Sequence, residues 1–312
     1  MASTTASTPV LVGPTGRWKG ALRGGRGALL ATFVLAGLFV FIWWVATRQA
    51  PFDPAGLSED ELLSKEFTGE VVKDESGNYI YNTEKTRGVP GPQQVAKKIW
   101  EEFSEPFHKK GTNDHGIGHL IRYTVSRFAA GFLAASVVAV LFGVLIGMSP
   151  MLYRIFNPFI QILKPISPLA WMPLLLYTVQ DPTWTAMLVV FMASLWPTIA
   201  NTAFGVGNIR KDYLQVASLL ELTWRERLFR VVLPAAAPAI VAGLRISFGS
   251  ALVAVVPAEM LLGELGIGYL SWIEWNNLDI AGVIFAIFTV GLVGVLLDTG
   301  FTRVARLVSY AD

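Results

Sequence analysis

The sequence predicts an all-α integral membrane protein with about six transmembrane helices. Two observations carry this prediction: charged residues make up only 15% of the 312 residues, and the hydrophobic residues, 53% of the chain, gather in long runs. A soluble domain carries about a quarter charged residues, and a helix needs roughly 20 apolar residues to cross the hydrocarbon core. The runs of suitable length are 28–47, 128–148, 155–179, 184–206, 236–256 and 280–297.

The first run, residues 28–47, contains no charge and predicts a retained transmembrane helix. A secretory signal peptide is the alternative, but its apolar region spans only about 7–15 residues and ends at a small-residue cleavage site. This run is longer, and no convincing cleavage site follows it. Residues 1–27 are expected to form a cytoplasmic tail, because basic flanks remain on the cytoplasmic side. The basic residues before the helix are Arg17, Lys19, Arg23 and Arg26.

Residues 48–125 separate the first two runs and are expected on the periplasmic side, because each span reverses the side of the membrane. Within this segment, residues 93–103 place Val95, Ile99, Trp100 and Phe103 at helical spacing, with lysines and glutamates between them. This pattern predicts an amphipathic helix on the outer membrane face. Contact with a partner protein is the alternative.

Residues 126–302 are expected to form the membrane core. Four prolines interrupt the third run, and proline ends or kinks a helix. The stretch 258–273 is too short and too rich in glycine to cross the membrane. Basic residues gather in loop 207–234 and in the tail 303–312, so the positive-inside rule places both of these segments and the N-terminus in the cytoplasm.

Loop 207–234 carries two apolar stripes at helical spacing, one between Tyr213 and Leu220 and one within 228–232. A helical loop that is too polar to insert into lipid is suited to dock into a groove of a soluble partner. A basic amphipathic helix on anionic lipid headgroups is the alternative, and periodicity alone favours it.

The spacing in this loop resembles the "EAA" loop of binding-protein-dependent ABC permeases: Glu-Ala-Ala, three residues, Gly, nine residues, Ile-x-Leu-Pro. Here Gln215 and Glu221 stand in place of the motif's Glu and Gly, and Leu233-Pro234 ends it at the same spacing. Loss of the glycine removes conformational freedom between two short helices, although Arg225 at i+4 could pair with Glu221. The resemblance implies a coupling helix that seats on an ATPase subunit through Gln215, Ala217, Leu220, Glu221, Arg225, Leu233 and Pro234.

From about residue 88 onward, the chain is similar to the nitrate, sulfonate and taurine group of these permeases. The segments that carry this likeness are 165–174, 238–246 and 258–268. Residues 111–113 and 194–202 look closest to nitrate and bicarbonate permeases. The resemblance implies the type I importer fold in a bacterial inner membrane. Its implied partners are a second copy of the chain, two cytoplasmic ATP-binding subunits, and a periplasmic or lipid-anchored substrate-binding protein.

Four residues are expected on the translocation pathway: Lys164, Trp171, Arg245 and Glu259. A charge at membrane depth costs about 2.5–3.5 kcal/mol on insertion scales and marks a functional site. Arg245 either attracts an anion or holds helices together through carbonyls or Asp298, and the structural role is favoured. Lys164 either lines a cavity at the broken third run or extends to the headgroups. The alternative for Trp171 is an ordinary aromatic residue at the membrane interface. Glu259 is expected to pair with a loop cation or to shape the outer gate.

The resemblance implies the membrane subunit of an ATP-driven importer for a small inorganic anion, with nitrate first among the candidates. Bicarbonate, cyanate and a sulfonate or taurine are the alternatives. The chain has no GxxxxGK[ST] loop, so ATP and Mg²⁺ are expected on the ATPase subunits and no cofactor on this chain. A stand-alone secondary carrier is disfavoured because no inverted repeat is detectable. A membrane enzyme is disfavoured because the spans hold no catalytic constellation.

Metal and nucleic-acid sites are not expected. The chain has no cysteine and three histidines, His108, His115 and His119. His115 and His119 are four residues apart, but Gly116 and Gly118 between them disfavour a helix. We therefore expect solvated loop histidines rather than metal ligands. The net charge of +2 provides no support for a nucleic-acid partner.

Overall fold

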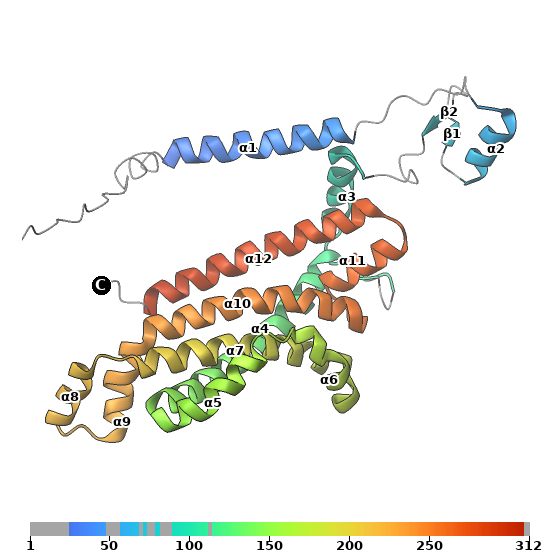
Figure 1. Ribbon diagram of the computed structural model, residues 1–312. Helices are drawn as coiled ribbons and strands as arrows, with labels where there is room; N and C mark the ends of the chain where they lie inside the picture. The colour runs from blue at the N-terminus through green and yellow to red at the C-terminus, as the bar shows by residue number, and fades with distance from the viewer. Residues whose placement is uncertain are drawn as a thin grey trace, which may run out of the picture. The chain divides into compact units, whose positions relative to one another are not determined.

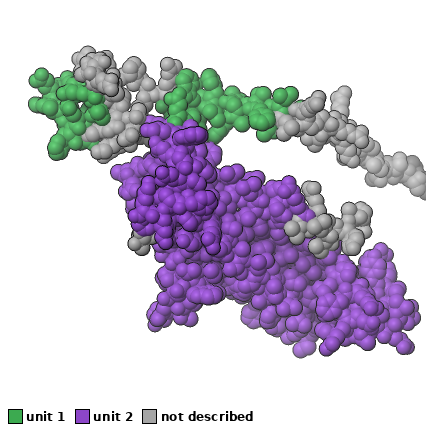
Figure 2. Space-filling model, turned by 180° about the vertical axis from the view of Figure 1, so that it is seen from behind, with its two compact units in different colours: residues 1–93 green, residues 94–312 purple. Residues whose placement is uncertain are grey.

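The computed structural model describes residues 25–47, 57–68, 71–73, 79–81, 89–111 and 114–308. The chain divides into two compact units, residues 1–93 and residues 94–312 (Figure 2). Most of the predicted cytoplasmic tail 1–27, namely residues 1–24, lies outside the described residues. Residues 309–312 of the predicted tail 303–312 do so as well.

The first unit contains the first apolar run as helix α1 (Gly25–Ala46) and a small module that the sequence analysis did not anticipate. This module consists of helix α2 (Glu59–Thr68) and an antiparallel hairpin of β1 (Val71–Lys73) and β2 (Tyr79–Tyr81). Its contacts centre on Glu66, which pairs with Lys73 at 3.6 Å and accepts a hydrogen bond from the Tyr79 hydroxyl at 3.2 Å.

The second unit is helical in its described part (Figure 1). It includes a 3₁₀ turn, η2, and a π turn, η3. In chain order, its elements are α3 (Pro92–Ser104), α4 (Ile117–Met148), α5 (Pro150–Leu163), η2 (Pro168–Trp171), α6 (Met172–Val179), α7 (Pro182–Gly207), α8 (Lys211–Leu219), α9 (Trp224–Arg227), η3 (Leu228–Val232), α10 (Leu233–Leu262), α11 (Ile267–Asn276) and α12 (Ile280–Val308).

Within the described residues, four helical stretches are long and apolar enough to cross a membrane: α4, α7, residues 224–262 and residues 280–303. A fifth span is possible if Pro150–Leu163 and Pro168–Val179, which meet at a 90° bend, are counted together. In α1 the apolar part is shorter, Leu30–Ala46. All six predicted runs are therefore helical. The third is broken at Pro165 and Pro168, because a proline ring cannot continue the hydrogen-bond pattern of a helix, whereas Pro158 lies inside α5.

The fifth span differs from its prediction. The predicted loop ends at Pro234 and the predicted span begins at residue 236. In the structure, one continuous helical stretch runs from Trp224 to Leu262. Pro234 lies just after the π turn η3. In a regular α-helix its ring would clash with the carbonyl four residues earlier. A π turn inserts extra backbone at that point and lets the helix continue.

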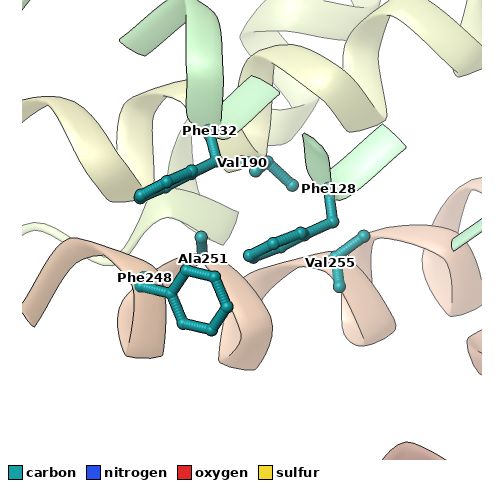
Figure 3. Close-up of a cluster of buried hydrophobic side chains, with 6 residues drawn as sticks. All are labelled: Phe128, Phe132, Val190, Phe248, Ala251 and Val255. Atoms are coloured by element: carbon teal, nitrogen blue, oxygen red, sulfur yellow. The ribbon is translucent and has the colours of Figure 1, made fainter. Parts of the chain in front are cut away.

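Helices α4, α7 and α10 form the centre of the bundle, with α7 packed against both of the others. Their buried cluster is drawn in Figure 3 and comprises Phe128, Phe132, Val190, Phe248, Ala251 and Val255. Close approach of α4 and α7 depends on Gly131, where a Cβ atom would lie 2.6 Å from the Met187 carbonyl oxygen. A small residue at such a crossing lets two membrane helices pack backbone to backbone.

Candidate functional site

A cavity of about 590 Å³ lies between the bend that follows α5, helix α7 and helix α10. Both membrane cations singled out from the sequence, Lys164 and Arg245, line it. Lys164 lies where α5 ends, directly before Pro165. The remaining lining includes the polar residues Ser167, Trp196 and Ser250 among apolar side chains.

Among the described residues, neither cation makes a side-chain hydrogen bond or ion pair, and both residues are exposed. A charge surrounded by apolar walls acts more strongly than the same charge in bulk water. The arrangement therefore suits a small anion, which would supply the missing counter-charge.

The role favoured for Arg245 from sequence was to hold helices together through carbonyls or Asp298, and the Arg245 side chain makes neither contact among the described residues. No ion pair joins these two residues. The reason is the direction of the side chain on α10. Leu244 and Phe248 pack towards Leu297 and Phe301 of α12. Arg245 is one residue beyond Leu244, so it lies about 100° around the helix from it.

The other two residues predicted for the pathway lie outside the lining of this cavity. Trp171 ends η2, whose earlier residues Pro168 and Leu169 do line it, and its indole N–H is buried without a hydrogen-bond partner. Glu259 is near the far end of α10 and is fully buried.

Glu259 belongs to a buried polar network that the sequence analysis missed. Arg127 of α4 donates from Nη1 to Oε1 of Glu259 at 2.9 Å. From Nη2 it donates to Oε2 of Glu264 at 2.6 Å. The Thr124 hydroxyl donates to Oε2 of Glu259 at 2.8 Å, and the Thr183 hydroxyl donates to Glu264 at 2.9 Å. The network therefore ties α4 and the start of α7 to the end of α10.

The cation expected for Glu259 is thus a helix residue, Arg127, and not a loop residue. Arg127 was not predicted as a charge within the membrane because it immediately precedes the second apolar run, which begins at residue 128. One signal could have found it: a glutamate inside an apolar helix must be paired or lose its charge. Arg127 is the basic residue adjoining that run.

A second candidate site lies at the opposite end of the bundle from α3 and α11, where α8 and α9 lie together (Figure 1). Its exposed large apolar side chains are Tyr213, Val216, Leu219, Leu220, Trp224 and Phe229. We call these residues the coupling surface. Exposed apolar patches of this kind mark interaction sites.

The residues predicted for coupling divide into two groups. Ala217 is buried under α8, and Leu233 is half-buried beside the cluster that holds Val232 and Ala236. The other five are exposed: Gln215, Leu220, Glu221, Arg225 and Pro234.

Glu221 adopts a left-handed backbone conformation, with a φ of 48°. Such a conformation costs a non-glycine residue roughly 1–2 kcal/mol. It closes α8, because the Leu222 N–H then reaches back to the Ala217 carbonyl at 3.2 Å, as in a Schellman cap. The EAA motif has its glycine at this position, and glycine is the residue that adopts this conformation most easily.

The ion pair considered between Glu221 and Arg225 is not present. The i,i+4 rule applies within one helix, but the chain turns between these residues and α9 begins only at Trp224. A capping box starts α9 instead: the Thr223 hydroxyl accepts from the Glu226 N–H at 3.4 Å, and the Glu226 carboxylate accepts from the Thr223 N–H at 3.1 Å.

The histidines differ from expectation in one respect. His115 is only 8% exposed, and neither ring nitrogen has a hydrogen-bond partner, so the prediction of a solvated residue is wrong for it. Gly116 permits this burial, because a Cβ atom there would meet the Pro106 carbonyl. His119 lies in the first turn of α4. Among the described residues, no group of three or more His, Cys, Asp or Glu is arranged to hold a metal ion.

Comparison with known proteins gives a consistent result. Residues 131–310 match the family model described as "Binding-protein-dependent transport system inner membrane component". The nitrate import permease protein NrtB of Synechocystis sp. is 38% identical over 224 residues, which cover 72% of this chain and 82% of the relative. NrtB of Synechococcus elongatus is 40% identical over 225 residues, covering 71% and 81%. The bicarbonate transport system permease protein CmpB of Synechocystis sp. is 35% identical over 205 residues, covering 65% and 73%.

Proposed function

We propose that this chain, which belongs to the family of binding-protein-dependent transport system inner membrane components, is the nitrate-conducting permease of an ATP-driven importer. Its membership makes it a multi-pass ABC permease subunit, a transport component and not an enzyme. The observation that carries the choice of an anion is the pair of unpartnered cations, Lys164 and Arg245, in one cavity.

Nitrate is favoured over bicarbonate by the identities: the two nitrate permeases are 38% and 40% identical to the chain, against 35% for the bicarbonate permease. The cavity chemistry supports both ions equally, because each is a small planar monoanion with three oxygens. Cyanate and sulfonates remain alternatives of the same kind.

A second copy of the chain would complete the pathway. Arg245, Gly249 and Val253 share an exposed stretch of α10 within a membrane span. Arg245 facing lipid at that depth would cost about 2.5–3.5 kcal/mol. Placing the same face opposite a second copy removes this cost and encloses the cavity between the two chains.

The remaining partners follow from the family. Two ATP-binding subunits would seat on the coupling surface, and a substrate-binding protein would deliver the anion from outside the bacterial inner membrane. We place both termini and the coupling surface in the cytoplasm. ATP and Mg²⁺ would act on the ATPase subunits.

The continuous helix offers a mechanical link between ATP hydrolysis and the cavity. Trp224 of the coupling surface and Arg245 of the cavity belong to the same helical stretch, 224–262. At 1.5 Å per residue they are about 32 Å apart along the axis. A tilt of this helix, driven by closure of the ATPase subunits, would move Arg245 and open the cavity to alternate sides.

The first test is uptake of labelled nitrate into proteoliposomes that contain the complete complex, ATP inside and the binding protein outside. We expect ATP-dependent accumulation that excess unlabelled nitrate abolishes and equal excess bicarbonate leaves largely intact. Accumulation of labelled bicarbonate without nitrate would replace the proposed substrate. Uptake that continues without ATP would favour a secondary carrier.

In the same assay, Lys164→Gln and Arg245→Gln are each expected to lower the nitrate uptake rate by about tenfold, equivalent to 1.4 kcal/mol. Each change removes one positive charge from the cavity and keeps a polar side chain of similar length. Lys110→Gln is the matched control, because Lys110 is exposed and pairs with Glu105 away from the cavity. Wild-type rates for both cavity variants, in complexes that assemble normally, would contradict the proposed pathway.

A further inference from the structure

Helix α3 presents three different faces. Val95 is buried against the rest of the unit, and Ile99 packs on the cluster of Ile117, Leu120 and Phe285. A second face carries exposed aromatic residues: Trp100 is 77% exposed, and Phe107, just beyond the helix, is 69% exposed. We call Trp100 and Phe107 the aromatic flank.

The third face of α3 is charged. It carries Lys97 and Glu101, which form an exposed i,i+4 ion pair at 3.7 Å. A helix with an aromatic stripe beside a charged stripe is suited to the boundary between lipid and water.

The contacts of α3 fix its level along α12. The ring of Phe103 meets the ring of Phe285 edge to face at 5.9 Å. Phe285 is the sixth residue of α12, about 7 Å along the axis from its first residue. Since the apolar part of α12 begins at Ile280, α3 lies beside apolar helix surface and not above it.

A partly buried ion cluster fixes the rotation of α3. The Lys98 ammonium lies 3.0 Å from Asp279, 3.4 Å from Glu274 and 3.6 Å from Glu102. Burial of the Lys98 ammonium lowers its pKa, but the hydrogen bond to Asp279 and the charge of Glu274 outweigh burial, and the pKa is raised above its ordinary value. Lys98 therefore stays charged and holds α3 to the segment before α12.

We propose that α3 is a phospholipid-binding helix in the outer headgroup region, with the aromatic flank inserted between the lipids. The ion cluster sets the orientation that leaves Trp100 exposed. The Phe107 ring meets the His119 ring of α4 edge to face at 5.6 Å, and its remaining surface is exposed. Trp and Tyr concentrate at membrane interfaces because one part of the ring system is apolar and another is polar. The aromatic flank also continues a set at the same end of the bundle, since Trp272 and Trp275 of α11 are exposed there.

Depth favours lipid over a soluble partner. A binding protein approaching from the periplasm reaches the ends of the membrane helices first. Phe103 of α3 instead lies level with the second turn of α12, beside the apolar side chain of Phe285. The charged face with Lys97 and Glu101 would remain towards water.

The absence of cysteine in the chain permits a direct test. Single variants Trp100→Cys and Phe107→Cys, with Glu101→Cys as the matched control one residue away, are labelled with a nitroxide. The complete complex is placed in nanodiscs of phosphatidylethanolamine and phosphatidylglycerol. Accessibility to oxygen, which concentrates in lipid, is compared with accessibility to a water-soluble nickel chelate. Nitrate uptake verifies that each variant is folded.

We expect the ratio of oxygen to nickel accessibility to be severalfold higher at positions 100 and 107 than at position 101. Equal nickel accessibility at positions 100 and 101 would overturn the proposal. So would labels at 100 and 107 that are exposed to nickel and become protected only when the binding protein is added. That outcome would identify a protein-docking surface instead.

Discussion

Replacing Arg127 with methionine is expected to lower the free energy of unfolding by about 3–5 kcal/mol, because it leaves a buried carboxylate without its cation. Glu259 is fully buried, and Arg127 pairs with it at 2.9 Å and with Glu264 at 2.6 Å. Methionine retains much of the volume of the arginine stem, so the loss reflects the unpaired charge more than a cavity.

The effect is measured by denaturant titration of the purified subunit in detergent. Arg210→Met is the matched control, because Arg210 pairs with Asp212 at 3.0 Å but both side chains are exposed. Exposed pairs contribute about 0–1 kcal/mol. The double variant Arg127→Met with Glu259→Gln is expected to recover a large part of the loss, since the buried charge is then also removed. An Arg127→Met loss no larger than that of Arg210→Met would show that the network does not stabilise the fold.

The second large effect is expected at the coupling surface. Leu220 is 66% exposed, so Leu220→Asp should leave the stability of the isolated subunit nearly unchanged. It places a charge among Leu219, Trp224 and Phe229, where an ATPase subunit would bury apolar surface. Loss of a central contact costs an interface about 2 kcal/mol or more, roughly thirtyfold in affinity. ATP-dependent uptake should fall accordingly.

Co-purification of the ATPase subunits and nitrate uptake are measured together. Phe67→Asp is the matched control: Phe67 is an apolar side chain, 95% exposed, on α2 of the first unit. It should alter neither quantity. If Leu220→Asp retained its ATPase subunits and its uptake rate, the coupling surface would have to be placed elsewhere.

Features of the candidate site that depend on residues adjacent in sequence were predictable. The proline-rich stretch after Leu163 predicted the broken span, and the break places Lys164 at a helix end beside the cavity. The apolar periodicity of loop 207–234 predicted helical structure there, and α8 and α9 lie in this loop. Its helix boundaries were less predictable, because a π turn lets the chain pass Pro234 without a break.

The partners of charged residues were not predictable in the same way. Arg127 and Glu259 are 132 positions apart, and Lys98 and Glu274 are 176 apart. Arg245 was expected to bond to carbonyls or to Asp298, yet the face of α10 that packs on α12 holds Leu244 and Phe248 instead. Such pairings depend on the rotation of each helix about its axis, which small differences in packing decide.

By itself, therefore, the sequence determined that this protein lies in lipid and where its long apolar helices lie along the chain. Run length, proline positions and the apolar period of α3 are properties of adjacent residues. In lipid, moreover, the backbone N–H and C=O groups must form their hydrogen bonds within each segment, so each span forms a helix. Only the tertiary structure decided which charges are neutralised and which are left free. Close approach at residues such as Gly131 sets the helix faces in contact. Those faces bury Arg127 with Glu259 and leave Lys164 and Arg245 in the cavity without partners from the described part of the chain.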